Sequence, residues 1–428
     1  MNSFSPTALL SSFVPRGTPL LSFVFKNHRI KLNRSFLLGF ICKSQLHTER
    51  GLEFDTGDSF FREESATGRD LGVLAASLYK NSKGSLRILD ALCGCGIRSL
   101  RYLVEAKADF VLANDGNDEN RNVILKNLST VPRGFGDDRR WYATHFDANR
   151  LMMERFLQND YFDLVDVDSF GSESTFLRHA LSIVKFDGLL YVTSTDGFSS
   201  GGHRPHHVLD SYGSYICRLP YPNEIGLRML IGGVVREAAV LGYHVTPLFS
   251  NYSFHGPVFR VMLRLNHQKL LDNRHYGFIG YCNKCGHSQT ISWEELGHIH
   301  CPCGEADVAV SGPLWIGPLH DRGYVSAMLD LAENWGWTTG EKGTGLGKLL
   351  NQMVDESDPR LSVGYIKLDK IAKHAKVNSP SVQIFMSTLQ KEGYAVSRSH
   401  IVSNAVKTNC PMATCVKIAK ELSKTHLS

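Results

Sequence analysis

The sequence predicts an α/β protein whose largest part is a Rossmann-like, doubly wound parallel sheet. Between residues 86 and 265, short apolar runs typical of buried strands alternate with segments whose apolar residues recur at helical spacing. The expected strands end in an aspartate or in a glycine-rich turn. A chain of 428 residues exceeds what one hydrophobic core usually supports, so we expect smaller domains after the sheet.

The elements of the sheet follow one another along the chain. We expect strands over 87–94, 110–115, 141–147, 162–168 and 188–196, with helices over 97–106, 119–128 and 174–184 between them. A long helix over 225–242 and a strand pair over 243–253 and 259–265 close the segment. The final pair predicts one antiparallel strand at the edge of the sheet.

The first 48 residues differ in composition from the rest of the chain. They contain no aspartate or glutamate, and six lysines and arginines are spread among seven serines and many apolar residues. This composition is typical of a chloroplast or mitochondrial transit peptide, whereas the alternative is a disordered tail on a nuclear or cytoplasmic protein. No run of 18 apolar residues occurs, so no membrane-spanning segment is expected.

A glycine turn and an acid define a candidate cofactor site. Ligands of such a sheet bind beyond the carboxyl ends of the strands, where "DALCGCG" (90–96) carries Gly94 and Gly96. Glycine lets the backbone pass close to a ligand and take positive φ. Asp115 ends the next strand, 19 residues past Gly96, where a carboxylate can bind the hydroxyls of a ribose.

The cofactor that fits these features is S-adenosylmethionine. The third glycine of a dinucleotide-binding G-x-G-x-x-G is replaced by Ser99, and no phosphate-binding G-x-x-x-x-G-K-[ST] occurs. S-adenosylmethionine has a ribose and an adenine but no phosphate, and Asp147 with Ala148 could receive the adenine amino group. In the alternative interpretation, Asp115 and Asp147 are helix N-caps.

An acid and an aromatic ring follow the strand over 162–168. An enzyme that methylates an exocyclic amino group of a base must hold that group by its hydrogens and clamp the ring flat. Asp168 can accept the hydrogen bonds and Phe170 can stack on the base, so both are candidate catalytic residues. In the alternative, Asp168 caps the helix that begins at Ser174 and Phe170 fills the core.

A series of stretches from about Glu49 to the C-terminus matches one known family in order. They include "FFREESATGRD", "DALCGCGIRSLRY", "ANDGN", "DANRLM", "DVDSFGS", "VTSTDG", "EIGLRMLIGGVVREAA" and "SGPLWIGPLHD". Over this range the chain resembles the tRNA (guanine-26-N2) dimethyltransferase family. The resemblance implies a class I methyltransferase sheet, S-adenosylmethionine as donor, and one or two methyl transfers to the N2 amino group of a tRNA guanine. With the composition of its first 48 residues, the chain is similar to organelle-targeted, plant-type members of the family.

The resemblance also implies roles for single residues. Arg69 of "GRD" and Arg98 of "GIR" would contact the donor beside the cofactor residues named above, and Asp168 would be the catalytic acid. The chain departs from the family at two points, with Ser169 where proline is usual and residues 198–201 where Leu-Cys-Gly is common. Proline would stiffen the loop that presents Asp168, so Ser169 puts the rate or the number of methyl transfers in doubt.

Four cysteines predict a metal site after the sheet. Two lie in a C-x2-C pair and two in a C-x-C pair, 15 residues apart. Four thiolates from two such turns are typical of a closed, structural zinc site. The predicted ligands are Cys282, Cys285, Cys301 and Cys303, with His300 or His287 as substitutes for one of them.

The C-terminal end carries most of the basic excess of a chain whose net charge is only +5. Residues 361–428 contain ten lysines and arginines against three acids, and 366–394 reads as two helices joined by a proline-bearing turn before a strand. This order resembles a winged-helix unit, an α+β domain that could bind the tRNA backbone. A dimerisation or packing domain is the alternative.

The sequence therefore predicts a tRNA (guanine-N2) methyltransferase, with position 26 as the expected target. Its predicted parts are a transit peptide (1–48), a methyltransferase domain (49–270), a zinc module (271–315) and a basic tRNA-binding domain (316–428). We expect tRNA as the partner, with no membrane and no obligate protein partner. The alternatives are methylation of another RNA amino group, and a tRNA-binding paralogue with weakened catalysis, for which Ser169 is the one indication.

Overall fold

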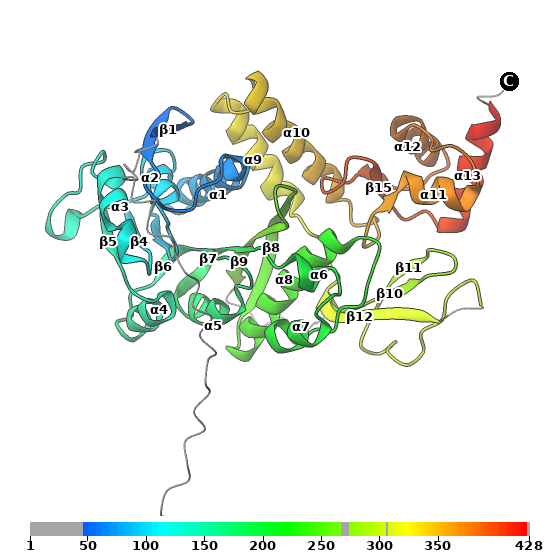
Figure 1. The fold of residues 1–428 in the computed structure, drawn as a ribbon, viewed down its shortest axis with the longest axis horizontal. Helices are drawn as coiled ribbons and strands as arrows, with labels where there is room; N and C mark the ends of the chain where they lie inside the picture. The colour runs from blue at the N-terminus through cyan, green and yellow to red at the C-terminus, as the bar shows by residue number, and fades with distance from the viewer. Residues whose placement is uncertain (1–45, 267–273, 305–306, 426–428) are drawn as a thin grey trace, which may run out of the picture. The chain divides into compact units, whose positions relative to one another are not determined.

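The computed structural model describes residues 46–266, 274–304 and 307–425, and the structural statements below concern these residues (Figure 1). Seven strands form the main sheet in the order β5-β4-β3-β6-β7-β9-β8. The sheet is doubly wound, as the sequence predicts. Its strands are β3 (Arg87–Asp90), β4 (Phe110–Asn114), β5 (Trp141–Thr144), β6 (Phe162–Asp168), β7 (Val184–Ser194), β8 (His244–Ser253) and β9 (Val258–Asn266).

The antiparallel strand lies inside the sheet rather than at its edge. β9 pairs antiparallel with both β7 and β8, while the other neighbours pair parallel. The expectation of an antiparallel edge strand is wrong in this detail. The reason is burial, because β9 is buried along most of its length, whereas β8 is only half-buried at both of its ends. The more completely apolar strand takes the position that is covered on both faces.

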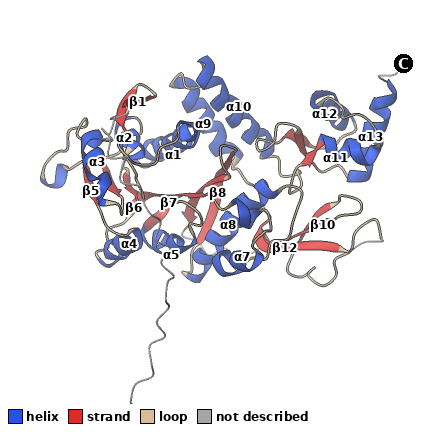
Figure 2. Ribbon diagram, viewed as in Figure 1, coloured by secondary structure: helices blue, strands red, loops and turns tan. Residues whose placement is uncertain are grey.

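Helices cover both faces of the sheet (Figure 2). Neighbouring strand residues point to opposite faces, so Ile88 of β3 joins one hydrophobic core and Leu89 joins the other. The first core contains residues of α1 (Ala66–Lys83), α2 (Ile97–Val104) and α3 (Arg121–Leu128). The second contains residues of α4 (Ala148–Leu157), α5 (Ser174–Ile183) and α8 (Pro222–Val240).

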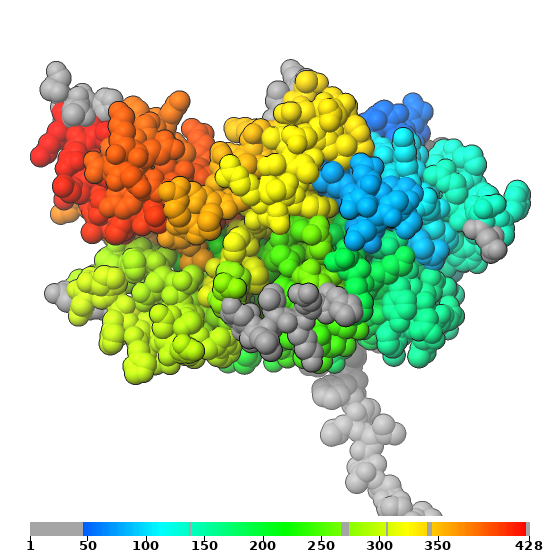
Figure 3. All heavy atoms as spheres, turned by 180° about the vertical axis from the view of Figure 1, so that it is seen from behind, coloured from blue at the N-terminus to red at the C-terminus, as the bar shows by residue number. Residues whose placement is uncertain are grey.

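Two helices that follow the predicted zinc module belong to the first of these cores. They are α9 (Arg322–Asn334) and α10 (Gly340–Glu356), and their side chains Met328 and Leu350 are fully buried beside those of α1. In Figure 3 the surface of α9 (yellow) adjoins that of α1 (blue). The predicted C-terminal part therefore begins with helices that complete the first core of the main sheet.

After the main sheet, the chain forms two further small sheets, and the second of them has its own helices. β10 (Tyr276–Cys282), β11 (Ser288–Ile291) and β12 (Val308–Trp315) pair antiparallel in the order β11-β10-β12. The C-terminal segment has the two predicted helices followed by a strand, and a short strand of the same small sheet precedes them. Its elements are β13 (Ile366–Lys367), α11 (Leu368–Ala375), α12 (Val382–Lys391), β14 (Val396–Arg398), β15 (Ala405–Thr408) and α13 (Met412–Thr425).

The chain is in regular structure by Leu46. β1 (Leu46–Glu49) pairs with β2 (Leu52–Asp55), so the last three residues of the predicted transit peptide belong to a strand, and the rest of it lies outside the described residues. Among the helices that the structure describes, none has the length and apolar character needed to cross a membrane.

Candidate active site

A cavity of about 670 Å³ opens beyond the carboxyl ends of β3, β4, β6 and β7. This is the edge of the sheet where the sequence analysis expects the site. Six predicted residues line the cavity, namely Arg69, Gly94, Arg98, Asp115, Asp168 and Phe170. Its lining among the described residues does not include the predicted Gly96, Asp147 and Ala148.

The glycine turn after β3 leaves room for a ligand. Gly94 and Gly96 have φ angles of 56° and 85°, which side chains disfavour, and a Cβ at Gly94 would meet no protein atom within 4 Å. Asp115 closes this turn, since its Oδ2 accepts the N–H of Gly94 at 2.9 Å. Its Oδ1 accepts the N–H of Asn117 and the Nδ2 of Asn120, each at 3.0 Å. The backbone of Gly94 and the carboxylate of Asp115 therefore lie together on the cavity wall.

Asp147 and Ala148 lie just after β5 at the same edge of the sheet. The Asp147 carboxylate accepts the N–H of Arg150 at 2.9 Å and caps α4, which is the alternative that the sequence analysis left open. Ala148 is the first residue of α4 and is buried. An N-cap does not use every acceptor position of a carboxylate, so their contact with an adenine stays a prediction.

A buried arginine connects two acids at the floor of the cavity. The Nη2 of Arg98 donates to Oδ2 of Asp168 at 2.6 Å, and its Nη1 donates to Oδ2 of Asp166 at 2.9 Å. Asp166 also accepts the hydroxyl of Tyr102 at 2.7 Å and is fully buried. The side chain of Asp168 is 30% exposed, so it is the acid of this pair that a ligand in the cavity can reach.

The same charges set the ionisation of the acids. Burial alone would raise the pKa of Asp168, but Arg98 and Arg260 attract its charge and hold that pKa below the usual value. Burial raises the pKa of Asp166, and burial together with the charge of Asp166 raises the pKa of Asp90 to about 8. Asp168 is therefore a carboxylate at neutral pH and can accept hydrogen bonds, while Asp90 keeps its proton.

Arg69 shapes the cavity wall from α1. Its guanidinium binds both carboxylate oxygens of Glu49 at 2.6–3.0 Å and donates to the carbonyl of Arg62 at 3.1 Å. Its charge also lies 4.9 Å from the ring centre of Phe61. Arg69 therefore fixes the segment that leads into α1, in addition to lining the cavity.

Phe170 meets a second aromatic residue that the sequence analysis missed. The rings of Phe60 and Phe170 lie 4.7 Å apart at 82°, and both line the cavity while remaining 58% and 70% exposed. An edge-to-face pair of this kind is a surface on which a flat base can stack. The available signal was the doubled aromatic Phe60-Phe61 in a polar segment, but only the fold brings it to Phe170.

The four predicted metal ligands converge in the small sheet of β10 to β12. The Sγ atoms of Cys282 and Cys303 are 3.8 Å apart, those of Cys285 and Cys301 are 3.3 Å apart, and all four lie within 4.8 Å of one another. A tetrahedral zinc ion with bonds of about 2.3 Å requires sulfur separations of roughly 3.8 Å, so the four thiols fit such an ion. His287 and His300 do not belong to this group of described residues.

His320, Glu356 and His400 also bring possible ligand atoms within 4.8 Å of one another. Nδ1 of His320 accepts the N–H of Ser250 at 3.3 Å, so the neutral ring carries its proton on Nε2, which lies 3.8 Å from Glu356. The ammonium group of Lys407 approaches the same carboxylate at 3.7 Å. Nδ1 of His400 lies 3.0 Å from the other oxygen of Glu356, so these four side chains form a buried charge network that joins α10 to the C-terminal segment.

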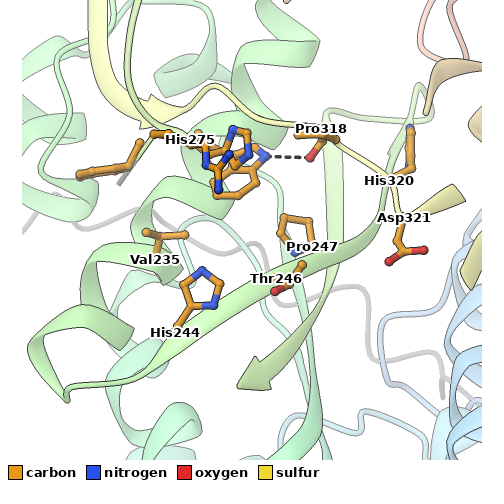
Figure 4. A pocket seen from close by; sticks show the side chains of 11 residues that line it. Val235, His244, Thr246, Pro247, His275, Pro318, His320 and Asp321 are labelled. Carbon is orange, nitrogen blue, oxygen red and sulfur yellow. Dashed lines mark hydrogen bonds between the residues drawn. The ribbon is translucent and has the colours of Figure 1, made fainter. Parts of the chain in front are cut away.

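A second cavity, of about 310 Å³, lies between β8, α8 and the end of β12 (Figure 4). His244 and Thr246 line it from β8 and Val235 from α8, and Nε1 of Trp315 donates to the carbonyl of Pro318 at 2.8 Å. Because β8 runs parallel to β7, its first residues lie at the edge opposite the 670 Å³ cavity. This second cavity contains none of the predicted site residues.

The strand order, with one antiparallel strand next to the edge and a glycine turn after the first parallel strand, defines a Rossmann-like methyltransferase sheet. The chain belongs to the N2,N2-dimethylguanosine tRNA methyltransferase family, whose model matches residues 43–420.

Relatives and a solved structure agree with this assignment. A tRNA (guanine(26)-N(2))-dimethyltransferase of Saccharolobus solfataricus is 30% identical over 370 residues, which cover 85% of this chain and 91% of that protein. The tRNA (guanine(26)-N(2))-dimethyltransferase of Thermococcus kodakarensis is 30% identical over 376 residues, which cover 85% of this chain and 93% of that protein. The structure of Trm1 from Pyrococcus horikoshii with S-adenosyl-L-methionine superposes with a TM-score of 0.74 at 26% identity, covering 87% of this chain and 99% of that one.

Proposed function

We propose that the protein is a tRNA (guanine-26-N2) dimethyltransferase that uses S-adenosylmethionine. One observation carries the proposal: an ionised acid, Asp168, and an exposed aromatic pair, Phe60 and Phe170, face one cavity beside the glycine turn. The family match over residues 43–420 and the names of the relatives support the substrate and the position.

The cavity wall next to β3 and β4 would hold the donor. S-adenosylmethionine, when bound, supplies a methyl group on a sulfonium centre. The open side of Gly94 lets the backbone approach the ligand closely, and the carboxylate of Asp115 can accept hydrogen bonds from the ribose hydroxyls. Arg69 and Arg98 hold the wall in place through their ion pairs, and Asp147 with Ala148 would meet the adenine.

The floor and mouth of the cavity would hold the guanine. Asp168 accepts an N–H of the amino group, which aims the nitrogen lone pair at the methyl group. The ring of Phe170 stacks on the base, and Phe60 supports that ring edge-to-face. Each methyl transfer displaces one N–H proton, and the Asp168 carboxylate can take it, because a methylated nitrogen that still carries this proton is a strong acid. An amino group has two N–H bonds, so after one transfer a single N–H remains for Asp168 to accept. The same contact therefore serves both methyl transfers.

Methylation of defined transcripts tests this function. Nucleosides from a tRNA with guanine at position 26, treated with protein and donor, should contain N2,N2-dimethylguanosine on mass spectrometry. A matched tRNA with adenine at position 26 should contain none. Dimethylguanosine formed equally in both transcripts would contradict the position, and no methylated guanosine in either would contradict the reaction.

We further propose that Cys282, Cys285, Cys301 and Cys303 bind one zinc ion that supports the β10–β12 sheet, since their sulfur separations suit it. The basic C-terminal segment would bind the tRNA backbone.

The acid-free N-terminal segment would direct import into an organelle. Its first 42 residues precede the part matched by the family model, as expected of an added signal. Fusing residues 1–48 to a fluorescent protein tests import, and a diffuse signal would contradict it.

A further inference from the structure

Exposed phenylalanine rings gather around the mouth of the active-site cavity. Besides Phe60 and Phe170, Phe198 of α6 (Gly197–Ser200) is 62% exposed, and Phe254 in the hairpin between β8 and β9 is 77% exposed. Clusters of large apolar side chains on a surface usually mark a binding site. The question is whether these two further rings belong to the same surface as the cavity.

Two contacts connect both rings to the cavity. Pro257 lines it, and a Cβ on Gly197 would lie 2.5 Å from the Cβ of Pro257, so Phe198 directly follows a residue packed on the cavity wall. Nη1 of Arg62 donates to the carbonyl of His255 at 2.7 Å, which ties the hairpin tip to the segment that carries Phe60. The segments that carry Phe198 and Phe254 therefore lie at the rim of the cavity.

Each rim ring carries a cation or an imidazole on its face. The guanidinium of Arg204 lies 4.9 Å from the ring centre of Phe198, and the His255 ring lies 4.0 Å from that of Phe254, tilted by 37°. Arg62 lies 5.0 Å from the centre of Phe60 in the same way. Aromatic rings combined with arginine are typical of surfaces that stack unpaired bases and attract the phosphate backbone.

The depth of Asp168 in the cavity indicates which bases of the tRNA Phe198 and Phe254 would contact. A guanine that reaches Asp168 must leave its helical stack, because the acid lies on the cavity floor while Phe170 stands at the mouth. Its two neighbours then lose a stacking partner. We propose that Phe198, with Arg204, and Phe254, with His255, stack on the nucleotides that flank the flipped guanine. This inference rests on the proposed function and extends it from the target base to its neighbours.

Steady-state methylation by full-length variants tests the inference. Phe198→Ala and Phe254→Ala should each raise KM for tRNA about tenfold and leave kcat close to that of the wild type, because the rings lie away from the reacting nitrogen. Affinity for the donor, measured by calorimetry, should not change. Phe135→Ala is the matched control, since Phe135 is 92% exposed but precedes β5, at the opposite edge of the sheet, and should leave KM unaltered.

Conservative replacements separate stacking from apolar contact. Phe198→Tyr and Phe254→Tyr should keep the wild-type KM, and the leucine variants should behave like the alanine variants. Wild-type KM in the alanine variants, or full activity with leucine, would overturn the inference while leaving the methyltransferase intact. If the wild type methylates no tRNA, the proposed function is wrong. Fluorescence anisotropy with labelled tRNA then tests whether Phe198 and Phe254 bind RNA, and equal Kd values for the wild type and the alanine variants would refute the inference.

Discussion

Asp168 accepts a 2.6 Å hydrogen bond from Nη2 of Arg98, and the other end of the same guanidinium binds Asp166 at 2.9 Å. One buried cation thus fixes the direction of the cavity acid and keeps it ionised. An acid whose pKa is lowered in this way is a weak base but a good acceptor of hydrogen bonds. Asp168 is therefore suited to orienting an amino group, and the methyl donor must supply most of the driving force.

Asp168→Asn should reduce the methylation rate by about 10²–10⁴-fold, because the amide cannot take up the proton and presents an N–H in place of one acceptor. Single-turnover rates on tRNA measure the effect. Donor and tRNA affinities should stay near those of the wild type, since Asp168 contacts only the target amino group in this proposal. A wild-type rate in the variant would show that "DSFG" is only a turn after a strand.

Arg98→Met should destabilise the fold by roughly 3–5 kcal/mol, because it leaves the fully buried Asp166 without its cation. Denaturant titration measures the free energy of unfolding. Adding Asp166→Asn should restore part of the loss, since the amide oxygen can still accept the Tyr102 hydroxyl. Equal stability of Arg98→Met and the wild type would contradict the role of Arg98 as counter-ion.

The sheet was predictable because its signals are local. The ends of β4 and β6, next to Asp115 and at Asp168, follow from apolar runs that stop at an acid, and the positive φ angles of Gly94 and Gly96 follow from the turn that two glycines allow. The spacing of the four cysteines likewise gave their grouping. In each case the residues that determine the feature are close neighbours in the sequence.

What the sequence left undetermined depends on contacts between distant segments. Phe60 meets Phe170 across 110 positions, and no periodicity marks that pair. Arg260 reaches the cavity only because Gly68 leaves room, since a Cβ there would lie 2.6 Å from its Nε. The position of β9 inside the sheet was decided by which strand could be buried on both faces.

Cys282→Ser should release zinc and lower the melting temperature, because a structural zinc ion contributes its binding free energy to folding. The metal content of purified wild type should be one zinc ion per chain by mass spectrometry. Cys217→Ser is a suitable control, since Cys217 lies outside the four-cysteine group. A wild type that contains no metal and melts like the Cys282 variant would contradict the zinc site.

Glu173 should make stability depend on pH around neutrality. It is fully buried, and burial together with the charge of Asp196 raises its pKa to about 7, although its Oε2 accepts the hydroxyl of Tyr212 at 3.2 Å. A raised pKa means that the contribution to stability is complete below about pH 4.5 and is lost as pH rises through about 7.

The wild type should therefore lose up to roughly 2–3 kcal/mol relative to Glu173→Gln between about pH 5 and pH 8. Urea unfolding of both proteins across this range measures the difference. The glutamine oxygen can still accept from Tyr212, so the substitution removes the charge and keeps the hydrogen bond. A constant difference between the two proteins at every pH would contradict the assignment.

Ser169→Pro should preserve methylation or increase its rate. Ser169 is buried directly after the cavity acid, and its hydroxyl donates to the carbonyl of Thr193 at 3.3 Å. Proline stands at this position in most of the family that the chain resembles, and Asp168 ends a strand, which is the conformation that a residue before proline prefers. Proline would lose the hydroxyl contact but restrict the loop that presents Asp168 and Phe170.

Ser169→Ala is the matched control because it removes the same hydroxyl without restricting the backbone. A faster proline variant beside an unchanged alanine variant would assign the gain to the rigid loop, whereas a folded but inactive proline variant would show that methyl transfer requires this loop to move.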